Sequence, residues 1–267
     1  MDGRNVTGVK RYFSLVTFSH TIFALPFALL AAVLAAGGAP ELRTLLGILV
    51  AMAGARSAAM AFNRIVDRDL DAKNPRTARR EIPAGTVSVA AASAFCALSA
   101  AVFVLAAWFL NPLCFALSPL ALAIVLGYSF TKRLSALSHL VLGLGLAIAP
   151  VGAWIAVTGR FASTPVVLGL SVLFWVAGFD VIYSLQDEAF DREQGLFSLP
   201  ARLGARRALD LSTVFHAASL ALLYGVFVLA KGGPLFGAGV GGGGGGWGPP
   251  PRTPGGGKNT PAATGRI

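Results

Sequence analysis

The sequence predicts an all-α fold, a polytopic bundle of transmembrane helices. Of its 267 residues, 55% are hydrophobic and only 13% are charged, and the mean hydropathy is +0.70. These values differ from those of an ordinary soluble domain. A membrane span takes roughly 20 mostly apolar residues. About seven such runs are present, at residues 15–37, 42–62, 89–110, 112–131, 137–158, 165–186 and 208–231.

The basic residues indicate how the bundle is oriented. If the N-terminus is cytoplasmic, sixteen of the 22 Lys and Arg residues fall in the inner segments or the adjoining helix ends. This excess is the positive-inside bias of membrane proteins. It predicts an integral membrane protein whose chemistry takes place on the cytoplasmic side; the bacterial inner membrane is the location expected from the family resemblance described below. Topology then explains the net charge of +10, so no nucleic-acid partner is expected.

Two long inner connections hold most of the acidic residues. Ten of the twelve Asp and Glu residues belong to these connections or to the helix ends beside them. The first connection, residues 64–87, contains helix-breaking prolines, and Thr86 or Ser88 is expected to cap the next span. We interpret this connection as an ordered cap over a site. The second, residues 192–207, also sets a glycine and a proline among basic residues.

Side chains that can bind a metal ion through oxygen recur at four-residue spacing where the second and sixth predicted spans end (42–62 and 165–186). The first row is Asn63, Asp67 and Asp71, and the second is Tyr183, Asp187 and Asp191. Residues at this spacing stack on one face of a helix. A single row is most often a solvated helix end, but two equal rows on one side of the membrane predict a cradle for divalent metal ions. A set of oxygen ligands without His or thiolate selects Mg²⁺. Protein-bound Mg²⁺ commonly also binds substrate phosphates, and the rows lie at the membrane edge. The predicted substrate is therefore a lipid diphosphate whose tail lies among the helices.

Residues near these rows are candidates for binding the rest of a substrate. Arg56 lies inside the apolar part of span two, where a guanidinium needs an anion or carbonyl groups as partners. Asp180 is the deepest carboxylate of span six and also needs a partner. Lys132 and Arg133 follow Tyr128 at the inner end of span four. They either anchor the span at the interface or capture an anion opposite the aspartates.

The two cysteines and His139 give weaker indications of function. Cys96 and Cys114 lie in apolar segments without ligand spacing, which indicates packed thiols rather than a zinc site or a disulfide. His139, at the start of span five, is compatible both with a packing role and with a position facing a cavity.

Residues 12–207 resemble the UbiA family of intramembrane prenyltransferases, in particular its 4-hydroxybenzoate polyprenyltransferase branch. The matching segments are HTIFALPFA, ARSAAMAFNRIVDRDLDAKNPRTARREIPAG, GYSFTKRLSALSHLVLG and GFDVIYSLQDEAFDREQGLFSLPARLG. The resemblance implies a nine-helix bundle around a cavity open sideways to membrane lipid. It also implies Mg²⁺-dependent ionisation of a polyprenyl diphosphate and attack by a small aromatic acid. In this branch the new bond forms ortho to the phenol, and the product feeds ubiquinone synthesis.

The resemblance also assigns roles to residues. The family motifs NxxxDxxxD and DxxxD map onto Asn63, Asp67 and Asp71 and onto Asp187 and Asp191, which become the Mg²⁺ ligands. Lys132, Arg133 and Arg68 are then expected to bind the diphosphate. The residues expected to bind the acceptor are Arg56, Tyr128, Asp180 and Tyr183.

Two of the acceptor residues have specific expected roles. Arg56 is the candidate for the acceptor's carboxylate. Asp180 is the candidate for polarising the phenol or accepting the ring proton. The residues expected to be catalytic are therefore Asp67, Asp180 and Asp187.

Other functions leave different patterns. A CDP-alcohol phosphotransferase also uses intramembrane aspartates, but it needs a DGxxAR element that this sequence lacks upstream of its aspartates. A membrane transporter would place such residues near the midplane on broken helices, whereas these cluster at one face. Within the UbiA family, an acceptor of menaquinone synthesis, either a naphthoate or a compound of the futalosine route, remains the alternative to 4-hydroxybenzoate.

The last part of the sequence departs from the family. Residues 1–231 form the expected transmembrane domain, and the last two helices of the family have no counterpart after Lys231. Residues 232–267 are rich in Gly and Pro, which predicts a disordered tail. A frame-shifted end is the alternative interpretation.

Overall fold

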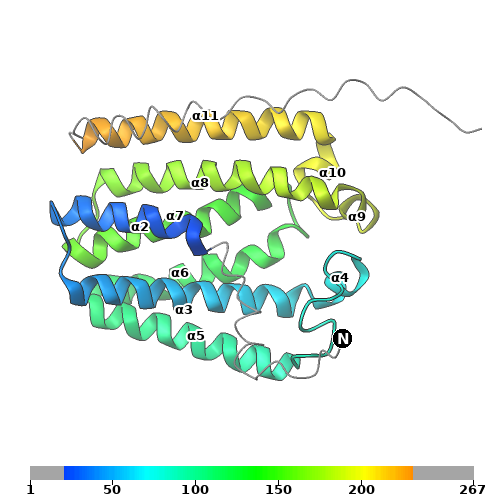
Figure 1. The fold of residues 1–267 in the computed structure, drawn as a ribbon, viewed down its shortest axis with the longest axis horizontal. Coiled ribbons are helices and arrows are strands. Elements are labelled where there is room, and N and C mark those ends of the chain that lie inside the picture. The colour runs from blue at the N-terminus through cyan, green and yellow to red at the C-terminus, as the bar shows by residue number, and fades with distance from the viewer. Residues whose placement is uncertain (1–20, 231–267) are drawn as a thin grey trace, which may run out of the picture.

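The structure is a computed structural model that describes residues 21–230, and these residues form helices and connections without any strand. The long helices lie side by side (Figure 1). They are α2 (Thr21–Ala36), α3 (Leu42–Val66), α5 (Val89–Leu110), α6 (Pro112–Thr131), α7 (Ser138–Thr158), α8 (Ser163–Ser184) and α11 (Ala205–Leu229). The short helices α4 (Arg68–Lys73), α9 (Glu188–Glu193) and α10 (Leu199–Leu203) lie at one end of the bundle.

The predicted all-α membrane bundle is confirmed. Within residues 21–230, six helices are long and apolar enough to cross a membrane: α3, α5, α6, α7, α8 with its continuation to Glu193, and α11. The helix α2 overlaps the first predicted span, but its described part is 16 residues long and begins where the described residues begin. The predicted tail, residues 232–267, lies outside the described part of the chain, so its disorder stays a prediction.

Local sequence signals set several helix ends. Ser88, one of the two predicted caps, accepts a hydrogen bond from the N–H of Ala91 at 3.1 Å. Asn111 accepts one from the N–H of Cys114 at 2.9 Å, and Pro112 follows it as the first residue of α6, where its missing N–H costs nothing. Gly159 ends α7 with φ of 67°, a left-handed conformation that glycine adopts without a steric penalty.

Neighbouring helices pack closely because small residues lie between them. The principal contacts join α3 to α5, α7 to α8, α8 to α11 and α2 to α7, while α6 bridges α5 and α7. Between α8 and α11, the hydroxyls of Ser171 and Ser219 each donate to the other residue's backbone carbonyl at 2.9 Å. Small residues and hydroxyl hydrogen bonds are the usual means of holding helices together in a membrane.

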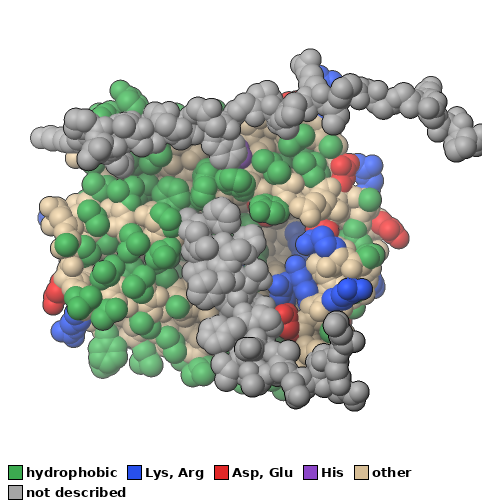
Figure 2. Space-filling view, viewed as in Figure 1, with side chains coloured by type: hydrophobic (Ala, Val, Ile, Leu, Met, Phe, Trp, Pro, Cys, Tyr) green, Lys and Arg blue, Asp and Glu red, His purple; other side chains and the backbone are tan. Residues whose placement is uncertain are grey.

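The outer surface is suited to lipid along the helices and to water at one end. Large apolar side chains such as Leu98, Phe109 and Tyr224 are at least 60% exposed, which a soluble monomer would rarely tolerate as a continuous belt. Figure 2 shows hydrophobic side chains spread along the helices, with most Lys, Arg, Asp and Glu side chains near the end that carries α4 and α9. The chain is an integral membrane protein.

The closest packing of α7 on α8 predicts a specific sensitivity to substitution. A Cβ placed on Gly143 would lie 2.3 Å from the backbone oxygen of Leu173, an atom that cannot move without displacing α8. We expect Gly143→Ala to lower the free energy of unfolding by about 1–3 kcal/mol, measured as thermal unfolding of the detergent-solubilised protein.

The matched control is Gly152→Ala in the same helix. A Cβ on Gly152 meets nothing within 4 Å, so this change adds helix propensity of about 1 kcal/mol without a clash. Equal unfolding temperatures for the two variants would contradict the packing described between α7 and α8.

Candidate active site

A polar cavity of about 540 Å³ opens at the end of the bundle that carries α4 and α9. Both rows of oxygen ligands line it, although they come from opposite halves of the chain. The predicted site residues among its walls are Arg56, Asn63, Asp67, Asp71, Tyr128, Lys132, Asp180, Tyr183, Asp187 and Asp191. The structure therefore brings ten of the twelve candidates to one space.

The first row stays aligned across the junction of α3 and α4. The N–H of Asp67 donates to the carbonyl of Asn63 at 2.9 Å, and that of Asp71 donates to the carbonyl of Asp67 at 2.7 Å, so helical spacing continues through the break. The Asn63 amide donates to Asp67 Oδ2 at 3.1 Å. This bond leaves the Asn63 side-chain oxygen available to a further partner.

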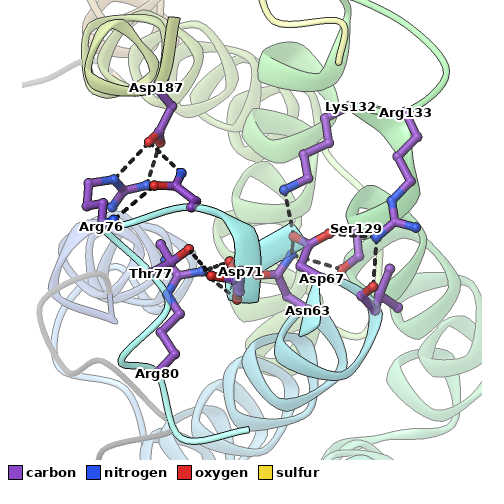
Figure 3. A network of polar contacts seen from close by, with 12 residues as sticks. Asn63, Asp67, Asp71, Arg76, Thr77, Arg80, Ser129, Lys132, Arg133 and Asp187 are labelled. Carbon is purple, nitrogen blue, oxygen red and sulfur yellow. Dashed lines mark hydrogen bonds and ion pairs between the residues drawn. The ribbon is translucent and has the colours of Figure 1, made fainter. Parts of the chain in front are cut away.

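Asp67 is the most deeply buried of these carboxylates, at 2% exposure. Two cations from the end of α6 neutralise it. Lys132 Nζ lies 2.8 Å from Oδ2, and Arg133 Nη2 donates to Oδ1 at 3.1 Å and to the carbonyl of Val66 at 2.7 Å. Lys132 therefore faces the aspartates (Figure 3), and its capture of an anion stays a prediction.

Asp71 is held by the connection that follows α4. Arg80 Nη1 donates to both carboxylate oxygens, at 2.7 Å and 2.9 Å, and the hydroxyl of Thr77 donates to the Asp71 carbonyl at 3.1 Å. These contacts fold residues 74–80 back over the cavity. The connection is an ordered cap, as its helix breakers and charges suggest.

Asp187 joins the second row to the same cap. Asn74 donates to its Oδ1 at 3.0 Å, and Arg76 donates through Nε to Oδ1 at 2.9 Å and through Nη2 to Oδ2. The hydrogen bonds to Asp187 raise the pKa of Arg76 above its usual value. Two parallel bonds between a guanidinium and a carboxylate fix direction as well as distance, so this pair connects the two halves of the site (Figure 3).

The remaining carboxylates of the second half have partners from other elements. Asp191 lies beside the side chain of Ser198. Asp180 Oδ2 lies 2.6 Å from His139 Nδ1. His139 was left open between packing and a cavity position, and it both is buried and lines the cavity.

The donor set fits a divalent metal that is completed by substrate. Within residues 21–230, no three His, Cys, Asp or Glu side chains lie close enough to form a metal cage, and Asp67, Asp71 and Asp187 are each paired with cations. Mg²⁺ in enzymes is commonly held by one or two carboxylates, waters and substrate phosphates rather than by a closed protein cage. Asn63, Asp67, Asp71, Asp187 and Asp191 supply oxygen ligands of this kind on two sides of one cavity.

A second cavity, of about 210 Å³ and almost entirely apolar, lies behind the polar one. The residues shared by both cavities are Arg56, Tyr128, Leu142 and Leu146. At this junction the Nε of Arg56 is buried and has no hydrogen-bond partner among the described residues. A buried donor without a partner is costly, which indicates a place for an anionic ligand.

Two predicted residues do not line the cavity. Arg133 reaches it only through Asp67. Arg68 is exposed, donates to the carbonyl of Ile65 at 3.2 Å and lies 3.5 Å from Asp69, so the structure gives no support to its expected contact with diphosphate. The register explains this, because Arg68 follows Asp67 by one residue and projects from another face of the helix.

The site also contains residues that were given no functional role beforehand. Arg64, Asn74, Arg76 and Arg80 were not singled out, and His139 was named without a role; all five line the cavity. The dense run NPRTARR was the available signal for the cap residues, but the sequence could not show which of its three arginines turn inward. His139 had no signal beyond its position.

Together the fold and the cavities define a class: a polytopic membrane protein with a charged chamber near one face and an apolar chamber behind it. The profile of the UbiA prenyltransferase family matches residues 24–249. The chain is 30% identical, over 82% of its length and 77% of the relative's, to a 4-hydroxybenzoate octaprenyltransferase of Shewanella frigidimarina. It is 29% identical, over 78% and 71%, to a 4-hydroxybenzoate solanesyltransferase of Synechocystis.

Solved structures show the same fold. An apo UbiA homolog from Aeropyrum pernix is 39% identical, with a TM-score of 0.79 over 85% of each chain. A UbiA homolog from Archaeoglobus fulgidus bound to GPP and Mg²⁺ is 23% identical, with a TM-score of 0.68 over 86% of this chain and 82% of that one. The chain belongs to the UbiA family, and it is a membrane-embedded prenyltransferase.

The pair of Arg76 with Asp187 predicts how firmly the cap is held. Because both side chains are partly exposed, the pair is expected to contribute about 1 kcal/mol to closing the cap. In Arg76→Ala, amide hydrogen exchange across residues 68–87 should therefore accelerate about fivefold at low salt.

Arg79→Ala provides the control, since Arg79 is exposed in the same connection and forms no ion pair in the described structure. Its exchange rates should match those of the wild type. Equal acceleration in both variants would mean that Arg76 does not hold the cap.

Proposed function

We propose that the protein transfers a polyprenyl group from a polyprenyl diphosphate to an aromatic acid, most specifically 4-hydroxybenzoate, in ubiquinone biosynthesis. One observation carries the proposal: a polar cavity with both aspartate rows meets an apolar cavity at Arg56 and Tyr128. A lipid diphosphate likewise joins a charged head group to an apolar chain. Its diphosphate suits the polar cavity, and its hydrocarbon chain suits the apolar cavity.

The names of related proteins support the same substrates. The relatives from Shewanella and Synechocystis are named for 4-hydroxybenzoate and for octaprenyl and solanesyl groups. UbiA homologs from Archaeoglobus fulgidus were solved with GPP and Mg²⁺ and with DMAPP and Mg²⁺. The proposal therefore includes Mg²⁺ as the cofactor of this chain.

At the diphosphate end, the chain supplies oxygen ligands and compensating cations. Asn63 and the carboxylates of Asp67, Asp71, Asp187 and Asp191 would hold Mg²⁺, which when bound neutralises charge on the departing diphosphate. Lys132, Arg76 and Arg80 lie beside these carboxylates and are positioned to donate to phosphate oxygens. Donors fixed in advance stabilise the charge that develops as the C1–O bond of the allylic diphosphate breaks.

At the acceptor end, Arg56 is proposed to bind the carboxylate of the aromatic acid. Its buried Nε is without a partner among residues 21–230, and a guanidinium matches a carboxylate in a two-bond geometry. Asp180 is proposed to accept the hydrogen bond of the phenol or the proton released from the ring. Tyr128 and Tyr183 line the intervening wall.

The reaction balances with these groups. The bond between the allylic carbon and the diphosphate oxygen breaks, a bond forms to the ring carbon ortho to the phenol, and that carbon loses one proton to Asp180. The inner membrane is the proposed location, with the polar cavity on the cytoplasmic side. The basic residues around that end of the bundle support this orientation.

The test is transfer of a labelled prenyl group by membranes that contain the protein. We expect a Mg²⁺-dependent lipid product with 4-hydroxybenzoate, lost on chelation and absent with benzoate, which lacks the phenol. Asp67→Asn should reduce turnover at least a hundredfold, since the neutral amide is a poor metal ligand, whereas the exposed neighbour Asp69 should tolerate Asp69→Asn.

Two outcomes would contradict the proposal. Product with a naphthoate or a futalosine-route acceptor but not with 4-hydroxybenzoate would move the enzyme to menaquinone synthesis. Equal loss in Asp67→Asn and Asp69→Asn would show that the measured effect is not specific to the proposed metal row.

Arg56→Ala separates the two substrates. Loss of the guanidinium should raise the KM for the aromatic acid by about tenfold to a hundredfold, as expected for a charged hydrogen bond of 1.5–3 kcal/mol. The KM for the prenyl diphosphate should change little.

The control for this prediction is Arg43→Ala, at the other end of α3, where the side chain is exposed. It should leave both KM values unchanged. Equal increases in both KM values for Arg56→Ala would contradict a specific role in binding the acceptor.

A further inference from the structure

His139 connects three elements that meet at the polar cavity. It lies in the first turn of α7 and is 3% exposed. One ring nitrogen faces Asp180 on α8, and the other faces the backbone of Leu199 at the start of α10. Both nitrogens therefore have partners, and the partners differ in kind.

The contact with Leu199 determines where the imidazole proton lies. The N–H of Leu199 can only donate, and it points at His139 Nε2 at 3.1 Å. A ring nitrogen that accepts a hydrogen bond carries no proton. The ring is therefore neutral, with its single proton on Nδ1, because the second nitrogen fixes the tautomer.

It follows that His139 donates to Asp180. The Nδ1–H points at Asp180 Oδ2 at 2.6 Å. This bond occupies one oxygen of Asp180 and directs the carboxylate, whose side chain remains 34% exposed in the cavity wall. The other oxygen is left for a ligand.

We propose that His139 is the positioning residue for Asp180. It holds that carboxylate in one orientation, so that its second oxygen can accept the phenol hydrogen bond or the ring proton of the aromatic acceptor. His139 itself touches neither substrate. This inference rests on the proposed function and assigns a role in it to a residue that the sequence left open.

The same short segment that fixes His139 also contacts the diphosphate end of the site. The N–H of Phe197 donates to the carbonyl of Lys132 at 2.8 Å, and the side chain of Ser198 lies beside Asp191. Residues 197–199 thus contact the backbone of Lys132, a proposed metal ligand and the histidine in succession. The segment that fixes the His139 ring is itself held by residues of the diphosphate end.

The experiment compares His139→Leu with His139→Gln. Leucine supplies no donor, whereas the glutamine amide can accept from Leu199 and donate to Asp180. We expect kcat to fall at least tenfold in His139→Leu, within the usual range for a disturbed acid or base, and less than threefold in His139→Gln. The KM for the prenyl diphosphate should stay within twofold of the wild type in both variants.

Asp180→Asn distinguishes positioning from a general effect on folding. If His139 acts through Asp180, then adding His139→Leu to Asp180→Asn should lower kcat no further. The amount of folded protein is measured by gel filtration in detergent. If His139→Leu does not accumulate, His139→Met, which is unbranched and also lacks a donor, replaces it in the same comparison.

Three results would overturn the inference while leaving the proposed function in place: wild-type kcat in His139→Leu, an equal loss in His139→Gln, or a full additional loss in the Asp180→Asn background. Failure of the wild-type protein to prenylate any aromatic acid would instead overturn both.

Discussion

The structure depends on the neutralisation of carboxylates at the end of a membrane bundle. A carboxylate as buried as Asp67 costs several kcal/mol unless cations and hydrogen-bond donors surround it. Its two cations, Lys132 and Arg133, come from α6, whereas Asp67 follows α3. The charge requirement therefore determines how these two helices meet. The same requirement folds the connection 68–87 over the cavity, because its arginines are the partners of Asp71 and Asp187.

These ion pairs connect structure to the proposed chemistry. Three of the carboxylates proposed as metal ligands, Asp67, Asp71 and Asp187, are each balanced by neighbouring arginine or lysine side chains. A divalent metal and a diphosphate together carry the same two kinds of charge, so both can enter without leaving a buried charge uncompensated. The apolar cavity behind Arg56 and Tyr128 continues the site away from the charges. Head and tail of one amphipathic substrate can thus be accommodated in one continuous path.

The second half of the site is organised around a short segment rather than around a helix. Residues 197–199 contact Lys132, Asp191 and His139. Through His139 this segment reaches Asp180, the carboxylate proposed to face the aromatic acceptor. The two substrates would consequently be bound by groups that share a support, even though the groups belong to different helices.

The sequence alone determined the fold class, the approximate positions of the spans from residue 42 onward and the spacing of the two aspartate rows, because these depend on local composition and spacing. Spans predicted at 89–110 and 112–131 coincide with α5 and α6, since apolar length, Ser88 and Asn111 specify them without reference to the rest of the chain. Spacing could not show that Arg68 turns outward while Arg76 and Arg80 turn inward. Nor could it show which partners the two nitrogens of His139 find. Those outcomes depend on side chains from segments that are distant in sequence and adjacent only in the packed bundle, so only the tertiary structure decided them.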